Sequence, residues 1–251
     1  MLSHLLFLFL SQATLMTGNN YGGSGNPELG SDPIRTIQEK PQASPGNPLK
    51  DLPVKAFPVD SSTSDFMVLV ISGDGGWNVW EESLRKEFNK RKIPVAGLDA
   101  LKYFWKEKTP EQTTSDLSII LDYYLTVWKK QSVILIGYSF GANIVPFVLT
   151  RLKDPFKEKV VKAVLISPDP EADFEIHIID MLNMDMAEYK YNVINELNKL
   201  KNTKILCLFG ATEDDERISL FGSSPVRVVE LPGNHHFRFN FPPIVDKILE
   251  K

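Results

Sequence analysis

One serine lies between two glycines in a run that could expose a nucleophile, Gly137-Tyr138-Ser139-Phe140-Gly141. The apolar run Ser132–Ile136 precedes it, and a helical pattern follows from Ala142. A serine on a sharp turn between strand and helix needs small neighbours two residues away on both sides. The turn would aim the helix N-terminus and the Phe140 N–H at a developing oxyanion. We expect Ser139 to act as a nucleophile; the alternative is a structural turn that has lost activity.

A serine needs a base to become reactive, and the chain has four histidines. His235 and His236 follow Gly233 in the loop after the apolar run Val226–Leu231. Such a loop can reach the carboxyl ends of the strands, where ligands bind in open α/β sheets. We favour His235 as the base and keep His236 as the alternative. His177 is interpreted as structural.

Where a serine on such a turn acts with an acid and a histidine, the three follow along the chain in the order serine, acid, histidine. The acid that orients the imidazole is therefore expected in the loop after the run Thr203–Phe209, which lies between Ser139 and His235. Four successive carboxylates lie there: Glu213, Asp214, Asp215 and Glu216. We choose Asp215, with Asp214 and Glu213 as alternatives. The remaining carboxylates are expected to be a solvated surface.

The glycine-rich run Ser72-Gly73-Asp74-Gly75-Gly76-Trp77 is expected to complete an oxyanion hole. Its glycines let backbone N–H groups approach a ligand closely. A phosphate-binding loop is the competing interpretation, but the Lys-Ser/Thr pair of a P-loop is absent. We expect the N–H of Gly73 or Asp74 to act together with that of Phe140.

An aromatic cluster, Tyr103-Phe104-Trp105, follows the run Ile93–Leu98. Core packing is the ordinary interpretation of such a cluster. The functional alternative is a wall of the substrate pocket, to which Trp77 and Tyr138 would also contribute. The methionines at 181, 184 and 186 are interpreted either as a small lid or as ordinary packing.

Strand and helix patterns alternate along residues 51–251 and must position these groups. Strands are expected at Phe66–Ser72, Ile93–Leu98, Ser132–Ile136, Val161–Ser167, Thr203–Phe209 and Val226–Leu231, with an edge strand in Leu52–Val59; helices are expected at Glu81–Arg91, from Thr109 to Trp128, and at Ala142–Leu152, Ala187–Leu200 and Pro243–Glu250. The strands are continuously apolar, as in a parallel sheet covered on both faces. The pattern predicts an α/β fold with a mostly parallel, doubly wound sheet, a nucleophile elbow and a minimal cap.

Composition divides the chain into three expected parts. Residues 1–16 resemble a secretory signal with a short apolar block, although Lys and Arg are absent before that block. Residues 17–50 contain six Gly and five Pro and predict a flexible linker to the folded domain at 51–251. The net charge of −4 argues against nucleic-acid binding. The single cysteine, Cys207, excludes an internal disulfide and a cysteine-based metal site, and no metal or cofactor is expected.

Several unusual motifs occur in a characteristic order. They are Ser-Gly-Asp-Gly-Gly-Trp at 72–77, Leu-Lys-Tyr-Phe-Trp at 101–105, Thr-Pro-Glu-Gln-Thr at 109–113, the run 137–142, Ala-Asp-Phe-Glu-Ile-His at 172–177 and the Gly-x-His-His-Phe that ends at Phe237. Together they resemble the VirJ/AcvB family of bacterial virulence proteins. The resemblance implies a periplasmic α/β hydrolase, linked to hydrolysis of lysyl-phosphatidylglycerol and to type IV secretion. It also implies Ser139, His235 and an acid within 213–215 as the catalytic positions. The segment 218–225 lacks a cysteine expected there, which puts a relative's disulfide in doubt here.

The sequence is therefore compatible with three functions. The first is a serine esterase that acts on an exported aminoacyl or lipid ester, with a lipid headgroup as its substrate. The second is a non-catalytic periplasmic adaptor that binds secretion-system proteins on a hydrolase scaffold. The third is a generic carboxylesterase or thioesterase with a small substrate.

Overall fold

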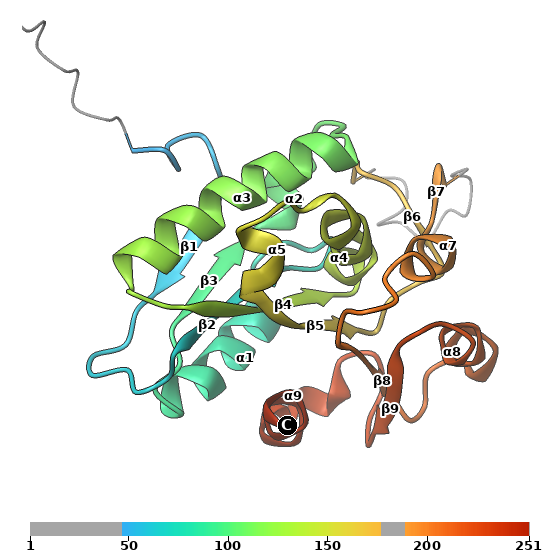
Figure 1. Cartoon of the computed structure of the whole chain (residues 1–251). Coiled ribbons are helices and arrows are strands. Elements are labelled where there is room, and N and C mark those ends of the chain that lie inside the picture. Colours follow the sequence, from blue (N-terminus) through green and yellow to red (C-terminus); the bar gives the residue numbers. More distant parts are fainter. Residues whose placement is uncertain (1–46, 177–188, 251) are drawn as a thin grey trace, which may run out of the picture. The chain divides into compact units, whose positions relative to one another are not determined.

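The computed structural model describes residues 47–176 and 189–250. A seven-stranded sheet forms the centre of the domain (Figure 1), with the strand order β1-β3-β2-β4-β5-β8-β9. Its strands are β1 (Val54–Phe57), β2 (Phe66–Ile71), β3 (Val95–Leu98), β4 (Ser132–Tyr138), β5 (Val160–Ile166), β8 (Ile205–Gly210) and β9 (Arg227–Leu231). Only β1 runs antiparallel to its neighbour in this sheet; the other pairs are parallel. The predicted doubly wound α/β fold and its edge strand are confirmed.

Helices cover both faces of the sheet (Figure 1). The longer ones are α1 (Val79–Lys90), α3 (Pro110–Val127), α4 (Phe140–Arg151), α8 (Asp215–Gly222) and α9 (Phe241–Leu249); the short ones are α2 (Ala100–Tyr103), α5 (Phe156–Lys159), α7 (Val193–Leu197) and the 3-10 turn η1 (Phe237–Phe239). Helices α1 and α9 lie on one face, and α3 and α4 lie on the other. None of the helices in the described ranges is long and apolar enough to cross a bilayer.

The continuous apolar strands result from this two-sided packing. Along β2, Val68 and Val70 contribute to the core under α1 and α9, whereas Met67, Leu69 and Ile71 contribute to the core under α3 and α4. Successive side chains of a strand point to opposite faces, so both sets must be apolar when both faces are covered.

Two parts of the sequence form structures that the pattern did not predict. The helix expected at Ala187–Leu200 is confirmed only at Val193–Leu197, where α7 lies. Before it, Tyr191–Asn192 forms β7 instead, which pairs with β6 (Glu171–Ala172). The carboxylates after β8 were expected in a loop, but Asp214 is the N-cap of helix α8 and Asp215 and Glu216 form its first turn. Near the start of the described residues, Leu49 is buried, so the end of the predicted linker packs on the domain. The leader at 1–16, His177 and the methionines at 181, 184 and 186 lie outside the described residues.

Candidate active site

Ser139 lies on a strained turn between β4 and α4. Its backbone has φ 50° and ψ −118°, a conformation rarely adopted by a residue with a side chain. A Cβ on Gly137 would lie 2.2 Å from the Gly141 carbonyl oxygen, and one on Gly141 would lie 2.3 Å from that of Ile71. Both glycines are therefore required sterically, as the spacing of the motif predicts. The strained turn exposes the hydroxyl at the carboxyl edge of the sheet.

A hydrogen-bonded chain runs from Ser139 through His235 to a carboxylate. His235 Nε2 lies 3.1 Å from Ser139 Oγ, and His235 Nδ1 lies 3.1 Å from Glu213 Oε2. With the proton on Nδ1, Nε2 accepts the hydroxyl proton of the serine. This arrangement can activate a serine for attack on a carbonyl carbon and can stabilise the imidazolium that forms.

Glu213 is held in place from several sides. Its Oε1 accepts hydrogen bonds from Ser167 Oγ at 2.8 Å and from the Gly210 N–H at 2.5 Å, and its Oε2 also pairs with Arg217. Burial raises the pKa of this carboxyl, but hydrogen bonds from His235, Gly210 and Ser167 outweigh that effect and hold the pKa below its usual range. Glu213 is therefore charged near neutral pH and faces the imidazole.

The choice of Asp215 as the acid is corrected by this geometry. Asp214 is the N-cap of α8, where its side chain accepts a hydrogen bond from the Arg217 N–H. Asp215 and Glu216 are exposed in the first turn of that helix, where acidic residues complement the helix dipole. The local sequence contained a signal for this arrangement, since Asp214 followed by a short helical pattern is an ordinary helix start.

The glycine-rich run forms the loop between β2 and α1. Of the two expected donors, the Gly73 N–H already donates to Glu81 Oε1 at 3.2 Å, so it does not point to Ser139 as a free donor. The same carboxylate accepts the Asn78 N–H at 3.1 Å, while the Asn78 side chain caps α1. Within the described residues no hydrogen bond from the N–H of Asp74 or Phe140 is found. These two groups flank the Ser139 cavity and are the remaining candidates for an oxyanion hole.

Glu81, in the first turn of α1, holds this loop and was not among the site residues predicted from the sequence. Its side chain is fully buried, and burial raises the pKa of its carboxyl. The signal was Asn78 followed three residues later by Glu81, which is the pattern of a capping box.

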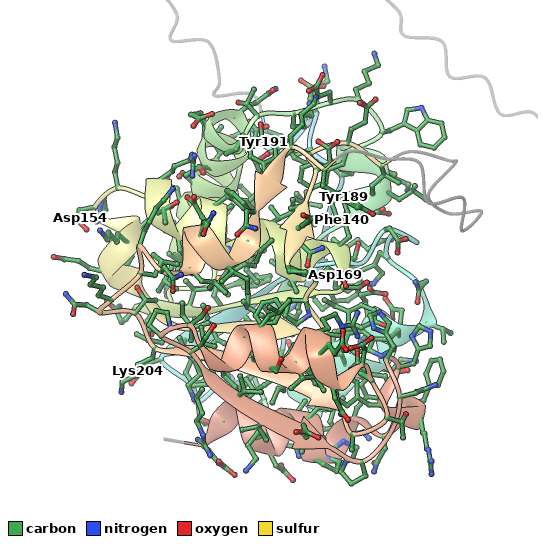
Figure 2. All side chains as sticks on the ribbon, turned by 90° about the vertical axis from the view of Figure 1, so that its right-hand side faces the viewer. Phe140, Asp154, Asp169, Tyr189, Tyr191 and Lys204 are labelled. Atoms are coloured by element: carbon green, nitrogen blue, oxygen red, sulfur yellow. The ribbon has the colours of Figure 1, made fainter. Side chains whose placement is uncertain are left out.

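A cavity of about 310 Å³ opens beside Ser139. Figure 2 looks onto this side of the molecule, where the labelled Phe140, Asp169 and Tyr189 lie around it. The acidic residues in its wall are Asp74, Asp169, Glu171, Asp173 and Glu175, and no lysine or arginine is among the described lining residues. Arg217, which is not among these lining residues, pairs with Asp169 at 2.7 Å. The cavity therefore presents negative charge to a ligand.

The aromatic residues expected in the pocket wall lie elsewhere. Phe104 is fully buried among other rings of the core, and Tyr103 is buried and donates to Asp116 Oδ2 at 2.5 Å. Trp77 stacks on Phe57. Its ring also lies so close to Gly97 that a Cβ at that position would collide with it. Trp105 is 54% exposed and does not line the Ser139 cavity. Core packing, the ordinary interpretation, is confirmed for Tyr103 and Phe104, and the alternative of a pocket wall is wrong for all four residues.

Tyr138 and His236 contact each other next to the catalytic residues. The Tyr138 hydroxyl lies 2.6 Å from His236 Nδ1, and its ring stacks on Trp80 with 3.6 Å between ring centroids. Tyr138 is buried and is not in the cavity wall, contrary to its expected pocket role. His236, the alternative base, contacts Tyr138, whereas His235 is the one that contacts Ser139. Burial and the neighbouring His235 lower the pKa of His236.

Comparison with known proteins places the chain among proteins of this architecture. Residues 65–251 match the family described as bacterial virulence protein (VirJ). No curated protein matches. A hydrolase from Oleispira antarctica superposes with a TM-score of 0.58 at 12% identity and covers 82% of this chain and 97% of its own. Est1E from Butyrivibrio proteoclasticus gives 0.55 at 11% identity, with 79% and 93% covered. The Pyrococcus furiosus esterase Pf2001 gives 0.54 at 15% identity, with 78% and 89% covered. At these identities the likeness shows the shared fold.

Proposed function

The chain belongs to the VirJ family of bacterial virulence proteins, and we propose that it is a serine esterase that cleaves a cationic aminoacyl ester through an acyl-enzyme on Ser139. The observation that carries the proposal is the hydrogen-bonded chain Ser139–His235–Glu213, with 3.1 Å at each step. A strained nucleophile turn at the carboxyl edge of the sheet supports it further.

In the first half-reaction, Ser139 Oγ attacks the ester carbonyl carbon and its proton passes to His235 Nε2. The N–H groups of Phe140 and Asp74 stabilise the negative charge on the carbonyl oxygen. The tetrahedral intermediate collapses when the C–O bond to the alcohol breaks, and His235 returns the proton to the departing alkoxide. Glu213 keeps the imidazole oriented and stabilises its charged form throughout.

In the second half-reaction, His235 takes a proton from water as the water oxygen attacks the acyl carbon on Ser139. The bond between that carbon and Ser139 Oγ then breaks, the serine regains a proton from His235, and the free amino acid leaves.

The acidic cavity supports a positively charged acyl group. A lysyl ester carries ammonium groups, and the exposed carboxylates of Asp74 and Glu171 in the wall favour such a charge near Ser139. The family resemblance points to the same chemistry, with lysyl-phosphatidylglycerol as the lipid form of the substrate and the periplasm as its location. The same carboxylates would repel an anionic acyl group and would not attract a neutral one. A generic carboxylesterase is therefore the weaker candidate.

Substitution of the nucleophile tests the proposal. Ser139→Ala is expected to reduce hydrolysis of a lysyl ester by about 10⁴-fold or more while the circular dichroism spectrum stays unchanged. The wild-type chain is also expected to react with a fluorophosphonate probe, and Ser139→Ala is not. Retained turnover in that variant would refute the assignment. A wild-type chain that neither hydrolyses esters nor takes up the probe would instead favour a non-catalytic adaptor for secretion-system proteins.

A further inference from the structure

Three exposed aromatic side chains lie on segments at the edge of the sheet that carries Ser139. Among the described residues, the large aromatic side chains that remain exposed are Trp105 at 54%, Tyr189 at 50% and Phe239 at 52%. Trp105 follows β3 and α2, Phe239 follows β9, and Tyr189 is in the wall of the Ser139 cavity. Because β3 and β9 belong to the parallel part of the sheet, the segments after them emerge at its carboxyl edge.

Two of these residues are tied to the active site by contacts. The backbone on either side of Trp105 pairs with the cavity wall, since the Ile176 N–H donates to the Phe104 carbonyl and the Lys108 N–H donates to the Phe174 carbonyl, both at 2.9 Å. The Phe239 ring stacks near His236, with 6.0 Å between ring centroids. Tyr189 is labelled in Figure 2 close to Phe140 on the same side of the molecule.

Each exposed aromatic residue has a cation next to it in the chain: Lys106, Lys190 and Arg238, respectively. Lys190 pairs with Glu107, whereas Lys106 and Arg238 are both exposed and form no ion pair with another residue of the described ranges. The other exposed large hydrophobic residues among those described are aliphatic: Val79 lies at the start of α1 on the Ser139 edge, and Val127 and Val161 lie toward the opposite edge. Aromatic side chains favour the interface between lipid and water, and basic residues beside them favour anionic lipids.

We propose that Trp105, Tyr189 and Phe239, together with Lys106 and Arg238, form a docking rim that seats the mouth of the Ser139 cavity on an anionic bilayer. The docking rim rests on the proposed function, because it explains how a headgroup ester in a membrane reaches a serine in a water-exposed cavity. The aromatic rings enter the headgroup region, and the two cations contact lipid phosphates. The carboxylates of the cavity stay above the surface, where they meet the cationic aminoacyl group.

Vesicle binding tests the docking rim independently of turnover. The full-length chain with Ser139→Ala is mixed with phosphatidylcholine vesicles that contain phosphatidylglycerol, and the bound fraction is measured by sedimentation. Adding Trp105→Ala and Phe239→Ala is expected to lower the partition coefficient by about tenfold or more, because two apolar side chains no longer enter the interface. The matched control is Val127→Ser, a residue 54% exposed at the end of α3, and it is expected to bind as its parent does. Equal binding by the double variant and its parent would overturn the docking rim.

A comparison of two substrates separates this proposal from the proposed function. In the active chain, Trp105→Ala with Phe239→Ala is expected to reduce kcat/KM for the vesicle-borne lysyl ester about tenfold more than for a water-soluble lysyl ester. An equal change for both substrates refutes the docking rim and leaves the esterase intact. Vesicle binding that depends on these residues in a chain without esterase activity refutes the esterase and leaves the docking rim.

Discussion

At the residue scale, the site depends on one carboxylate among four neighbours. Glu213 lies three residues after the end of β8 and turns back toward His235, while the next three residues start α8. Only Glu213 is shielded, with 3% of its side chain exposed. A carboxylate in that position is both oriented and charged, which are the two properties a base partner needs.

Replacing Glu213 and Asp215 in separate variants should show which of these carboxylates acts as the catalytic acid. Glu213→Gln is expected to lower kcat/KM for a lysyl ester by about 10³–10⁴-fold, because the amide no longer stabilises the imidazolium or fixes its tautomer. Asp215→Asn is the matched control, since that side chain is exposed at the start of α8 and should leave kcat/KM within about twofold of wild type. Steady-state kinetics on both variants checks this, and a larger loss in Asp215→Asn would restore Asp215 as the acid.

Glu213 also makes folding stability depend on pH. Its pKa in the folded chain is lower than the ordinary value of 4.5, so the folded state favours the charged form. The resulting stabilisation is present above about pH 4.5 and disappears as the pH falls through the folded pKa. Urea unfolding of wild type and Glu213→Gln should therefore show that wild type loses more unfolding free energy than the variant when the pH falls below that value. A difference that stays constant across this range would contradict the assignment.

At the element scale, the loop from Gly73 to Asn78 and the helix α1 behave as one unit around Glu81. The buried carboxylate accepts N–H groups from both ends of the loop, so it fixes the path on which Asp74 lies. Sequence reasoning predicted the strands and most helices because their apolar patterns are local. It left core packing and a pocket wall open for Tyr103 and Phe104 and expected Trp77 in the pocket, because burial in an aromatic core depends on neighbours from distant segments, such as Phe174 and Phe57. Contacts between distant segments also decided which of several local carboxylates faces His235.

Removing the Glu81 carboxylate should loosen this loop. Glu81→Ala is expected to lower the free energy of unfolding by about 1–3 kcal/mol, because the buried Gly73 N–H and the partly buried Asn78 N–H lose their acceptor. Its kcat for ester hydrolysis should fall as well, whereas Glu81→Gln, which keeps an acceptor oxygen, should retain more of both. Ser83→Ala on the same helix is the control and should change stability by less than about 0.5 kcal/mol. Chemical unfolding and kinetics on the three variants check this, and equal behaviour of Glu81→Ala and wild type would refute it.

The turn that holds Ser139 should tolerate no side chain at Gly137. A Cβ there meets the Gly141 backbone at 2.2 Å, so Gly137→Ala is expected to cost about 3 kcal/mol of stability or more and to displace Ser139. Gly222→Ala is the matched control, because no atom lies within 4 Å of its Cβ and alanine favours the helix in which it sits. Thermal unfolding should show a lower Tm for the first variant and an equal or higher Tm for the second. Equal Tm values for wild type and Gly137→Ala would show that the turn relaxes.

At the scale of the whole molecule, charge is distributed unevenly around the active-site edge. The chain carries a net charge of only −4, yet five carboxylates line one small cavity. Exposed cations beside Trp105 and Phe239 lie on loops of the same edge, outside the described lining of that cavity. Composition alone conceals this pattern, because residues distant in sequence are brought together only by the order of the strands. The fold thus places an acidic cavity and exposed cations at one edge, as the proposed acyl-group site and docking rim require.

The charge of the cavity leads to a prediction about substrate choice. Wild type is expected to prefer a lysyl ester over an alanyl ester, and Glu171→Gln should raise KM for the lysyl ester about two- to fivefold, because one favourable charge near a partly solvated site is lost. KM for the alanyl ester should change little, and added salt should weaken the preference in wild type, since mobile ions screen the field. Glu216→Gln, an exposed carboxylate outside the cavity wall, is the control. If Glu171→Gln and Glu216→Gln had the same effect on both esters, general surface charge would explain the preference, and the cavity carboxylates would have no role in selecting the acyl group.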